Sequence, residues 1–322
     1  MIRWLTGLVA VAALLWSGWW LVGSAWVLRG VTAGVEDLRA QGWEIAYDDL
    51  SVAGFPNRFD TNVDAPQVTA PDGATGWSAP FLQVFALTYR PTHLIAVAPH
   101  EMMFFGPRGQ VQVTSDDLRG SVVGSALTDP VLVRATVTGE RVAVSGDGFD
   151  VALEAAQVAT RQAGSEAVHD VALTLSGMTL GTNLRALLDP GQVLPPVIGT
   201  VSADTQITLT EAVGAGRSPL IAGVTVRNAA LAWGDVRLDI NGDVVVGVGG
   251  VPEGTLTLRA EGWRQVLRLA VGLGLLDEAR LPLIAAGVGA MADGDGAVTL
   301  DLVLAGGQMS LAGIPLGPVP GL

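Results

Sequence analysis

The feature that most constrains this chain is an apolar stretch near its beginning, because residues 4–28 (WLTGLVAVAALLWSGWWLVGSAWVL) contain no charged side chain. A helix needs about 20 apolar residues, each rising about 1.5 Å, to cross the hydrocarbon core of a bilayer. The stretch is therefore long enough to span a membrane. Tryptophans lie toward both of its ends, and indole rings favour the interface between lipid and water. The expected membrane-interface residues are Trp4, Trp16, Trp19, Trp20 and Trp26.

A membrane anchor and a cleaved secretory signal both begin with an apolar helix, and Gly23-Ser24-Ala25 offers small residues for a peptidase. The apolar run exceeds the roughly 7–15 residues of a signal's hydrophobic region, which favours a transmembrane anchor over residues 1–28. Arg3 in a short head before a long domain predicts that the head stays inside. All 18 basic residues are arginine, as in GC-rich bacterial genomes. We therefore expect a single-pass inner-membrane protein with its C-terminal domain in the periplasm.

The composition limits the partners of the exported part. With 49% hydrophobic and 15% charged residues, the chain lies on the globular side of the boundary with disorder. A net charge of −13 argues against binding to nucleic acid and to anionic lipid headgroups, so any lipid contact should be through acyl chains. The chain contains no cysteine, which excludes disulfides and thiolate chemistry.

A helical stripe continues beyond the apolar stretch. Val27, Val31, Val35 and Leu38 recur at spacings of four, four and three, and Gly42 offers a C-terminal stop. This pattern predicts a helical extension over residues 29–42 that acts as a spacer packed on the following sheet. A partner-binding coiled coil is the alternative, but one short stripe lacks sustained heptads.

From Trp43 the spacing of apolar residues changes from the helical period of 3.6 to the strand period of 2. Residues 54–60 (GFPNRFD) interrupt this strand pattern. Glycine allows a sharp bend and proline holds the preceding residue extended, which predicts a tight connection between two strands. The two phenylalanines are expected to plug the end of a sheet. Arg58 and Asp60 should pair on one strand face, with an anion contact of Arg58 as the alternative. The motif residues, for which we expect a structural role, are Gly54, Phe55, Pro56, Arg58, Phe59 and Asp60.

The N-terminal apolar helix, the following strand, the GFPxRFD motif and Trp77 within GWSAP resemble the alphaproteobacterial domain-of-unknown-function family 2125. The resemblance covers most of the chain, through the closing segment GIPLGPVPGL at residues 313–322. It implies a membrane-anchored protein whose biochemistry is not established. Such proteins are similar in architecture to AsmA-type inner-membrane-anchored β-groove proteins, which are implicated in lipid transfer. That likeness implies a β-groove that handles lipid.

The middle of the chain reads as one half-buried antiparallel strand after another, with alternating valines and leucines punctuated by Gly, Asp or Pro. Asn241-Gly242 is the dipeptide that a type I′ hairpin turn demands, and we expect it to join two strands. Breaks are expected at Pro195-Pro196 and at residues 214–219. They divide the chain into a first β-rich half at residues 43–213 and a second at residues 220–322.

The helical period returns near the end of the chain. Trp263, Val266 and Leu267 begin an i, i+3, i+4 stripe, and a second helical segment covers residues 278–291. We therefore expect two helices within residues 253–292. The following DGDG at residues 293–296 could suggest a calcium loop, but further oxygen ligands and a glutamate at position 12 are missing, so a tight turn is expected.

The sequence offers no recognisable catalytic motif. Without lysine there is no P-loop, and neither GxSxG nor GxGxxG after a strand occurs. His93, His100 and His169 are too scattered for a zinc site and are expected in turns or on the surface. A pair of carboxylates could still meet in space, as in glycosidases. We expect no enzyme, no cofactor and no metal.

The fold class that follows is mainly β, with an N-terminal transmembrane helix, an extended or curved antiparallel sheet and a few helices near the C-terminus. Many strands carry an apolar face, and the chain holds only enough helix to cover part of it, so the remainder must close on itself or carry an apolar ligand. One expected function is a non-catalytic role in cell-envelope maintenance, with phospholipid acyl chains bound or transferred through an apolar β-groove. The alternative is a structural scaffold that binds another envelope protein.

Overall fold

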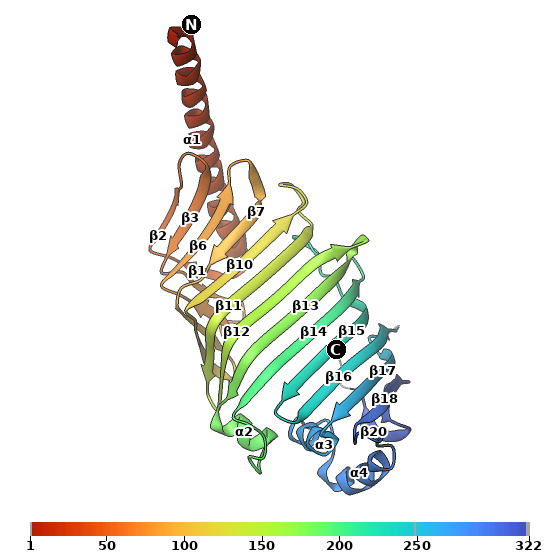
Figure 1. The fold of residues 1–322 in the computed structure, drawn as a ribbon. Helices are drawn as coiled ribbons and strands as arrows, with labels where there is room; N and C mark the ends of the chain where they lie inside the picture. Colours follow the sequence, from red (N-terminus) through yellow and green to blue (C-terminus); the bar gives the residue numbers. More distant parts are fainter. Residues whose placement is uncertain (1, 248, 320–322) are drawn as a thin grey trace.

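The computed structural model describes residues 2–247 and 249–319 and has one long helix followed by a large antiparallel sheet (Figure 1). The expected mainly β fold, with a long apolar N-terminal helix and short helices near the C-terminus, is confirmed. The helices are α1 (Ile2–Ala40), α2 (Thr182–Leu188), α3 (Trp263–Gly272), the 3₁₀ turn η1 (Glu278–Arg280) and α4 (Leu281–Gly289). The strands are β1 (Glu44–Ala46), β2 (Asp49–Ala53), β3 (Arg58–Asp64), β4 (Gln67–Thr69), β5 (Gly76–Ser78), β6 (Phe81–Leu87), β7 (Arg90–Val97), β8 (Glu101–Gly106), β9 (Gly109–Thr114), β10 (Asp117–Gly124), β11 (Leu132–Gly146), β12 (Phe149–Ala163), β13 (Ser165–Leu180), β14 (Val197–Leu209), β15 (Ile221–Trp233), β16 (Val236–Val246), β17 (Pro252–Glu261), β18 (Val298–Ala305), β19 (Gln308–Leu311) and β20 (Ile314–Pro318).

The sheet has one unbranched part and one forked part. From β11 to β20 each strand pairs with the next strand in the chain. On its other edge, the long β11 pairs with β10 over residues 132–140 and with β9 over residues 143–146. Two branches start there, β10-β7-β6-β3-β2 and β9-β8-β5-β4-β1. Residues 44–124 therefore form two narrow sheets that merge into one at β11.

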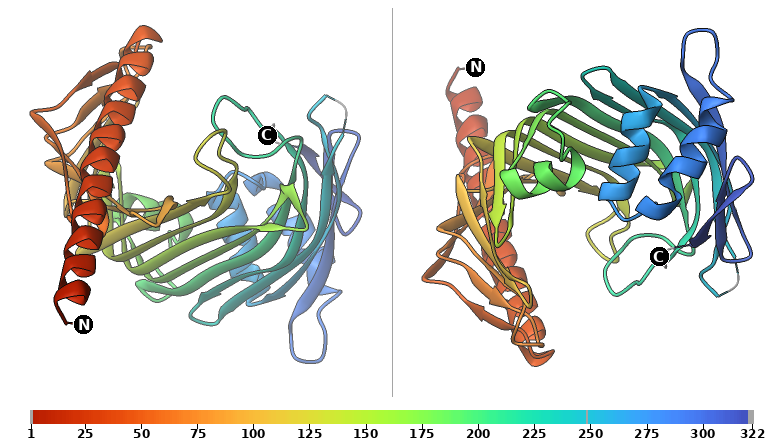
Figure 2. Two further views of the ribbon diagram at one scale, coloured as in Figure 1. Left: turned by 90° about the horizontal axis from the view of Figure 1, so that it is seen from above. Right: turned by 90° about the horizontal axis from the view of Figure 1, so that it is seen from below.

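The sheet is curved into a trough (Figure 2). Figure 1 shows α1 along the first strands and α2, α3 and α4 at one end of the later strands. Strand twist accumulates along an open sheet, and bulges or irregularities shift the register between β10 and β11, β12 and β13, β15 and β16, and β19 and β20. These two features bend a sheet that would otherwise be flat.

A large cluster of buried hydrophobic side chains lies beneath the C-terminal helices. Trp263 and Leu267 of α3 and Ile284 and Val288 of α4 are buried against Val298 and its neighbours on the last strands. A second buried cluster surrounds Trp233, whose indole nitrogen donates to the carbonyl oxygen of Pro195 at 2.8 Å. The two predicted helices are present, but residues 252–261 belong to β17, so the helical region begins at Trp263 and not at residue 253.

The predicted turn at Asn241-Gly242 is wrong. Both residues lie inside β16, which is continuous from Val236 to Val246, and the β15–β16 turn is at Gly234-Asp235. Gly242 has a φ of +140°, and a Cβ there would lie 2.2 Å from the carbonyl oxygen of Thr255 on β17. The glycine thus permits a close approach between two strands, which is the other role of glycine in a sheet.

The expected boundary between two halves falls on the loop from residue 210 to residue 220. This loop joins β14 to β15, which are adjacent antiparallel strands with Leu209 opposite Ile221. The sheet therefore continues without a break from residues 43–213 into residues 220–319. Pro195-Pro196 lies in the connection between α2 and β14.

The strand role of Gly242 leads to a first prediction. Gly242→Ala should lower the free energy of unfolding by about 1–3 kcal/mol, because alanine at this φ is strained and its Cβ meets the Thr255 carbonyl. The measurement is chemical denaturation of the full chain in detergent micelles. Gly106→Ala is the matched control, since the space around its Cβ is open. Equal stability of the two variants would contradict the close approach.

Candidate functional site

One face of the sheet carries a row of uncharged, mostly apolar residues that begins on β3 and ends on β20. Side chains of residues directly opposite each other in an antiparallel pair lie on the same face, so a chain of register partners traces one face across many strands. We call this the inner face. The row consists of Phe59, Ala86, Leu94, Val122, Ala135, Thr160, Val171, Thr205, Val226, Gly242, Leu256, Leu302, Leu311 and Ile314.

A second row runs beside the first, two residues along each strand, and is equally free of charge. It consists of Val52, Thr61, Val84, Ala96, Gly120, Val137, Val158, Leu173, Ala203, Ala229, Ile240, Leu258 and Leu300. The opposite, outer face is mostly polar along the same strands. A typical outer row is Arg119, Thr138, Gln157, Thr174, Ser202, Ala230, Asp239, Arg259 and Thr299.

Helices cover the inner face at its two ends. At the first end, Phe59 lies under α1, where its ring stacks on Trp20 at 6.4 Å and a Cβ on Gly23 would lie 2.5 Å from it. At the other end, Ile314 packs against the cluster built by α3 and α4. The first apolar row thus begins beneath the long apolar helix and ends beneath the C-terminal helices.

Between these ends the inner face is open. Four neighbouring aliphatic side chains on β7, β10, β11 and β12 are 43–45% exposed, although all four belong to the apolar rows. They are Leu94, Val122, Val137 and Val158. Single exposed aliphatic residues are ordinary, but a contiguous exposed apolar surface marks a binding site for another apolar molecule or for a partner protein.

An apolar cavity extends the inner face beneath α3 and α4. Its volume is about 190 Å³, and its lining side chains are all apolar. Leu258, Leu300 and Leu302 of the inner rows form part of its floor, and Trp263 and Leu267 of α3 form part of its roof. An apolar cavity of about 150 Å³ is known to stay dry and to accept benzene, so this space suits an apolar ligand.

Two loops meet across the trough at the strand ends opposite α2. Val131 forms an isolated bridge with Gly214, and the Leu132 amide donates to the Val213 carbonyl at 2.8 Å. Arg217 forms an ion pair of 2.8 Å with Asp129. These loops precede β11 and follow β14, so the contact spans the ends of β12 and β13 and holds the curvature there.

The GFPNRFD segment forms the predicted tight connection, between β2 and β3. Gly54 has a φ of +97°, and a Cβ there would lie 2.8 Å from the Asp60 carboxyl carbon. The Arg58 guanidinium is 2.7 Å from the Asp60 carboxylate, as expected for a pair, and Arg58 remains half exposed. Phe59 is buried, whereas Phe55 is 56% exposed, so only one of the two phenylalanines plugs the sheet.

Trp77 lies in the other branch of the sheet. It belongs to a third apolar row, formed by register partners in β1, β4, β5, β8 and β9. The row consists of Ile45, Val68, Trp77, Phe104 and Val111.

The tryptophans of α1 divide into two groups. Trp4, Trp19 and Trp26 are 59–86% exposed, and Trp16 is 41% exposed. Trp16 and Trp20 face the sheet, and their indole nitrogens donate to the carbonyl oxygens of Pro56 at 2.9 Å and Arg58 at 2.7 Å. Sequence reasoning placed all five at a membrane interface and missed that two of them bind the β2–β3 connection.

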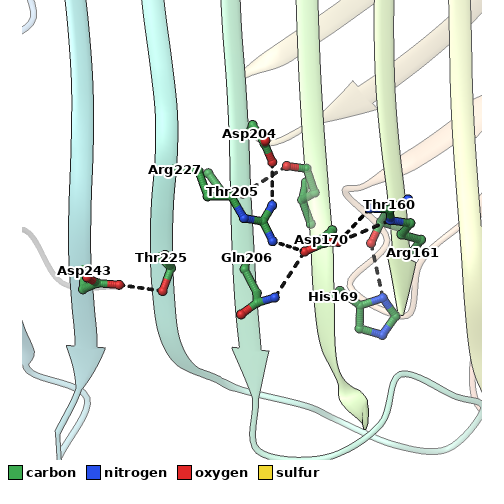
Figure 3. Close-up of polar contacts among 11 residues, drawn as sticks. Thr160, Arg161, His169, Asp170, Asp204, Thr205, Gln206, Thr225, Arg227 and Asp243 are labelled. Atoms are coloured by element: carbon green, nitrogen blue, oxygen red, sulfur yellow. Dashed lines mark hydrogen bonds and ion pairs between the residues drawn. The ribbon is translucent and has the colours of Figure 1, made fainter. Parts of the chain in front are cut away.

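A charged network crosses β12 to β15 on the outer face (Figure 3). The Asp170 carboxylate accepts hydrogen bonds from Arg227, from Gln206 at 3.2 Å and from Arg161. Arg227 also pairs with Asp204 at 2.7 Å. The hydrogen bond from Arg227 is the main cause that lowers the pKa of Asp170 below its ordinary value. Each charged side chain already pairs with one of opposite charge, so we interpret the network as a set of cross-strand ion pairs that stabilises the sheet, and call it the brace.

The histidines do not form a metal site. Among residues 2–247 and 249–319, no group of three or more His, Asp or Glu side chains converges in a way that could hold a metal ion. His100 is exposed, as expected, and its Nδ1 donates a hydrogen bond to the Ser115 carbonyl oxygen at 2.9 Å. The expectation was wrong for His93, which lies half-buried in β7, and for His169, which is buried in β13 beside Thr160.

The turn predicted at residues 293–296 is present. The Asp293 carboxylate accepts the amide hydrogens of Asp295 at 3.1 Å and Ala297 at 2.8 Å, and it also pairs with Arg259. These hydrogen-bond donors occupy the Asp293 carboxylate oxygens that a bound cation would need.

Comparison with known proteins identifies a family but no function. A family model described as "Uncharacterized protein conserved in bacteria (DUF2125)" matches residues 20–320 of the chain. No curated protein and no solved structure matches the chain.

The Asp170 network leads to a second prediction. Because the pKa of Asp170 is lowered in the folded chain, its stabilising contribution is present above the ordinary carboxyl pKa and is lost as the pH falls through the lowered one. Asp170→Asn should therefore reduce Tm at neutral pH, and the difference from the unmodified chain should vanish in acid. Thermal unfolding between neutral pH and pH ~3 measures this difference. Glu166→Gln, at an exposed position of β13, is the control, and an equal effect of both variants would contradict the brace.

Proposed function

The chain belongs to this bacterial family of unknown function, and we propose that it is a membrane-anchored envelope protein that holds lipid acyl chains along its inner face. In this proposal α1 crosses the inner membrane once and the sheet lies in the periplasm. The role is non-catalytic, in maintenance of the cell envelope.

The properties of α1 support the anchor. It is a candidate membrane span, and none of its most apolar window is buried inside the protein. A buried apolar core helix would pass the same test of length, but its side chains would be covered. Cleavage after Ala25 would remove Trp16, Trp20 and Gly23, which contact the β2–β3 connection and Phe59. The folded sheet therefore uses residues that a cleaved signal would discard.

The observation that carries the lipid proposal is the continuity of the inner face. Its apolar rows run from the anchor to the C-terminal helices without a charged residue, and their middle is exposed. An acyl chain gains about 0.8 kcal/mol for each methylene that leaves water, so a long apolar surface can hold a lipid tail by burial alone. The net charge of −13 disfavours attraction of anionic headgroups, which leaves the tails as the source of affinity. A groove of this kind is also what the likeness to AsmA-type proteins implies.

The anchor yields a third prediction. The mature protein should retain residues 1–25, remain with membranes after alkaline extraction, and place a reporter fused after Leu322 in the periplasm, because α1 is both span and part of the fold. N-terminal mass spectrometry, fractionation and reporter activity measure the three properties. A soluble protein that begins after Ala25 would contradict the anchor.

The open inner face yields a fourth prediction. The full chain, purified in detergent after extensive washing, should carry phospholipid that mass spectrometry detects. The double variant Val137→Glu, Val158→Glu should lose most of this lipid, because two carboxylates would lie on the exposed apolar surface. Lipid that surrounds α1 should be unaffected.

Val245→Glu is the control, because Val245 is even more exposed, at 61%, but lies opposite Gly223 and Glu253 on the outer face. Equal lipid content in both variants would contradict the groove. If the unmodified chain carries no lipid but retains a second envelope protein that the double variant releases, the scaffold alternative becomes the better account.

A further inference from the structure

We propose that the connection between β2 and β3, which we call the hairpin tip (residues 54–58), enters the same bilayer as α1 and lies beside the helix in its outer leaflet. The proposal rests on the anchor of the proposed function. It adds a second membrane contact, and it assigns to the GFPNRFD motif the binding of a phospholipid bilayer.

The position of the hairpin tip along α1 sets its depth. Trp16 binds the Pro56 carbonyl and Trp20 binds the Arg58 carbonyl, so the tip points toward the N-terminal end of α1. From Trp4 to Trp16 the helix rises about 18 Å, at about 1.5 Å per residue. The hydrocarbon core is about 30 Å thick. If the span begins at Trp4, Pro56 lies within the core and Arg58 lies closer to the headgroups.

The backbone of the hairpin tip is suited to lipid, where no water is available to satisfy carbonyl groups. The Gly54 carbonyl accepts from the Arg58 amide at 3.0 Å, and the Pro56 and Arg58 carbonyls accept from the two indoles. The Asn57 carbonyl accepts from the amide and the hydroxyl of Thr88, at 3.0 and 3.2 Å. Proline itself has no amide hydrogen to satisfy. Four of the five carbonyl groups of the hairpin tip thus accept hydrogen bonds from donors within the protein.

The exposed side chains at and beside the hairpin tip are of the types that favour a membrane, aromatic rings and arginine. Phe55 is 56% exposed, and Tyr89, in the β6–β7 turn that Thr88 ties to the tip, is 64% exposed. Exposed aromatic rings favour the membrane interface. Arg58 and Arg90 lie at the bases of the two turns and remain exposed. Arg58 already pairs with Asp60, so Arg90 is the side chain whose guanidinium group can reach lipid phosphates by extending outward.

This position places the beginning of the inner face at the level of the lipid. Phe59, the first residue of the apolar row, directly follows Arg58 and packs on α1. An acyl chain that leaves the bilayer beside the hairpin tip would meet the inner face without crossing water. The hairpin tip is therefore the lipid entrance of the trough.

Fluorescence quenching tests the depth, and the absence of cysteine allows single-site labelling. The variants Phe55→Cys, Tyr89→Cys, Leu8→Cys and Val245→Cys are each labelled with an environment-sensitive fluorophore. The full chains are reconstituted in vesicles of phosphatidylethanolamine and phosphatidylglycerol. One vesicle set contains lipid with a nitroxide on the upper acyl chain, and iodide is the aqueous quencher. Leu8 reports the anchor and Val245 reports an exposed site on the outer face.

We expect the label at position 55 to show blue-shifted emission, strong quenching by the nitroxide lipid and protection from iodide, close to the behaviour at position 8. Position 89 should be quenched by the nitroxide lipid less than position 55. If position 55 is as open to iodide as position 245 while position 8 is lipid-embedded, the hairpin proposal fails and the anchor stands. If position 8 is also open to iodide, both fail. Position 89 remains informative if the change at Phe55 disturbs its edge contact with Trp20.

Discussion

The hydrogen-bond register between neighbouring strands is the constraint on which the rest of the structure depends. Because side chains alternate with a period of two, a slip of one residue between two strands would turn one apolar row to the outer face from that point onward. The register from Phe59 to Ile314 keeps uncharged, mostly apolar residues aligned across every strand pair of this row, including the bulge between Val226 and Ala229. The outer charges support this register, since Asp170 and Arg227 join strands that are not adjacent. The trough is therefore a consequence of backbone pairing, and its apolar surface is kept open by the small amount of helix available to cover it.

The helices explain where the trough begins and ends. At the first end α1 covers Phe59 with Trp20 and with the bare backbone of Gly23, so a helix apolar enough for a bilayer also completes the fold. At the other end α3 and α4 bury the inner face but leave a cavity of about 190 Å³. Helix α1, the hairpin tip, the exposed aliphatic side chains and the cavity thus lie along one surface. We infer a path for acyl chains from this order.

The sequence predicted which segments form helices and strands better than it predicted which of them contact each other. Alternating valines and leucines in the middle of the chain indicated strands, and the stripe at Trp263 indicated a helix, because both periods are local. Asn241-Gly242 was misread because the same dipeptide serves a turn or a close approach between strands, and only the position of Thr255 decides between them. The fork at β11 and the indole contacts of Trp16 and Trp20 join residues far apart in the chain, which no local period reveals. The motif residues were singled out from the sequence, but the exposure of Phe55 and the alignment of Val137 with Val158 required the register.

Photocrosslinking with adjacent residues as controls tests the central claim that lipid tails lie on the inner face. A benzophenone side chain is placed at Leu94 or Val137, on the inner face, and at the following residue of each strand, Ile95 or Thr138, on the outer face. The full chain is irradiated in native membranes, and adducts are identified by mass spectrometry. The account predicts phospholipid acyl adducts at positions 94 and 137 and few or none at positions 95 and 138. Equal yields on the two faces, or protein adducts alone at positions 94 and 137, would contradict it.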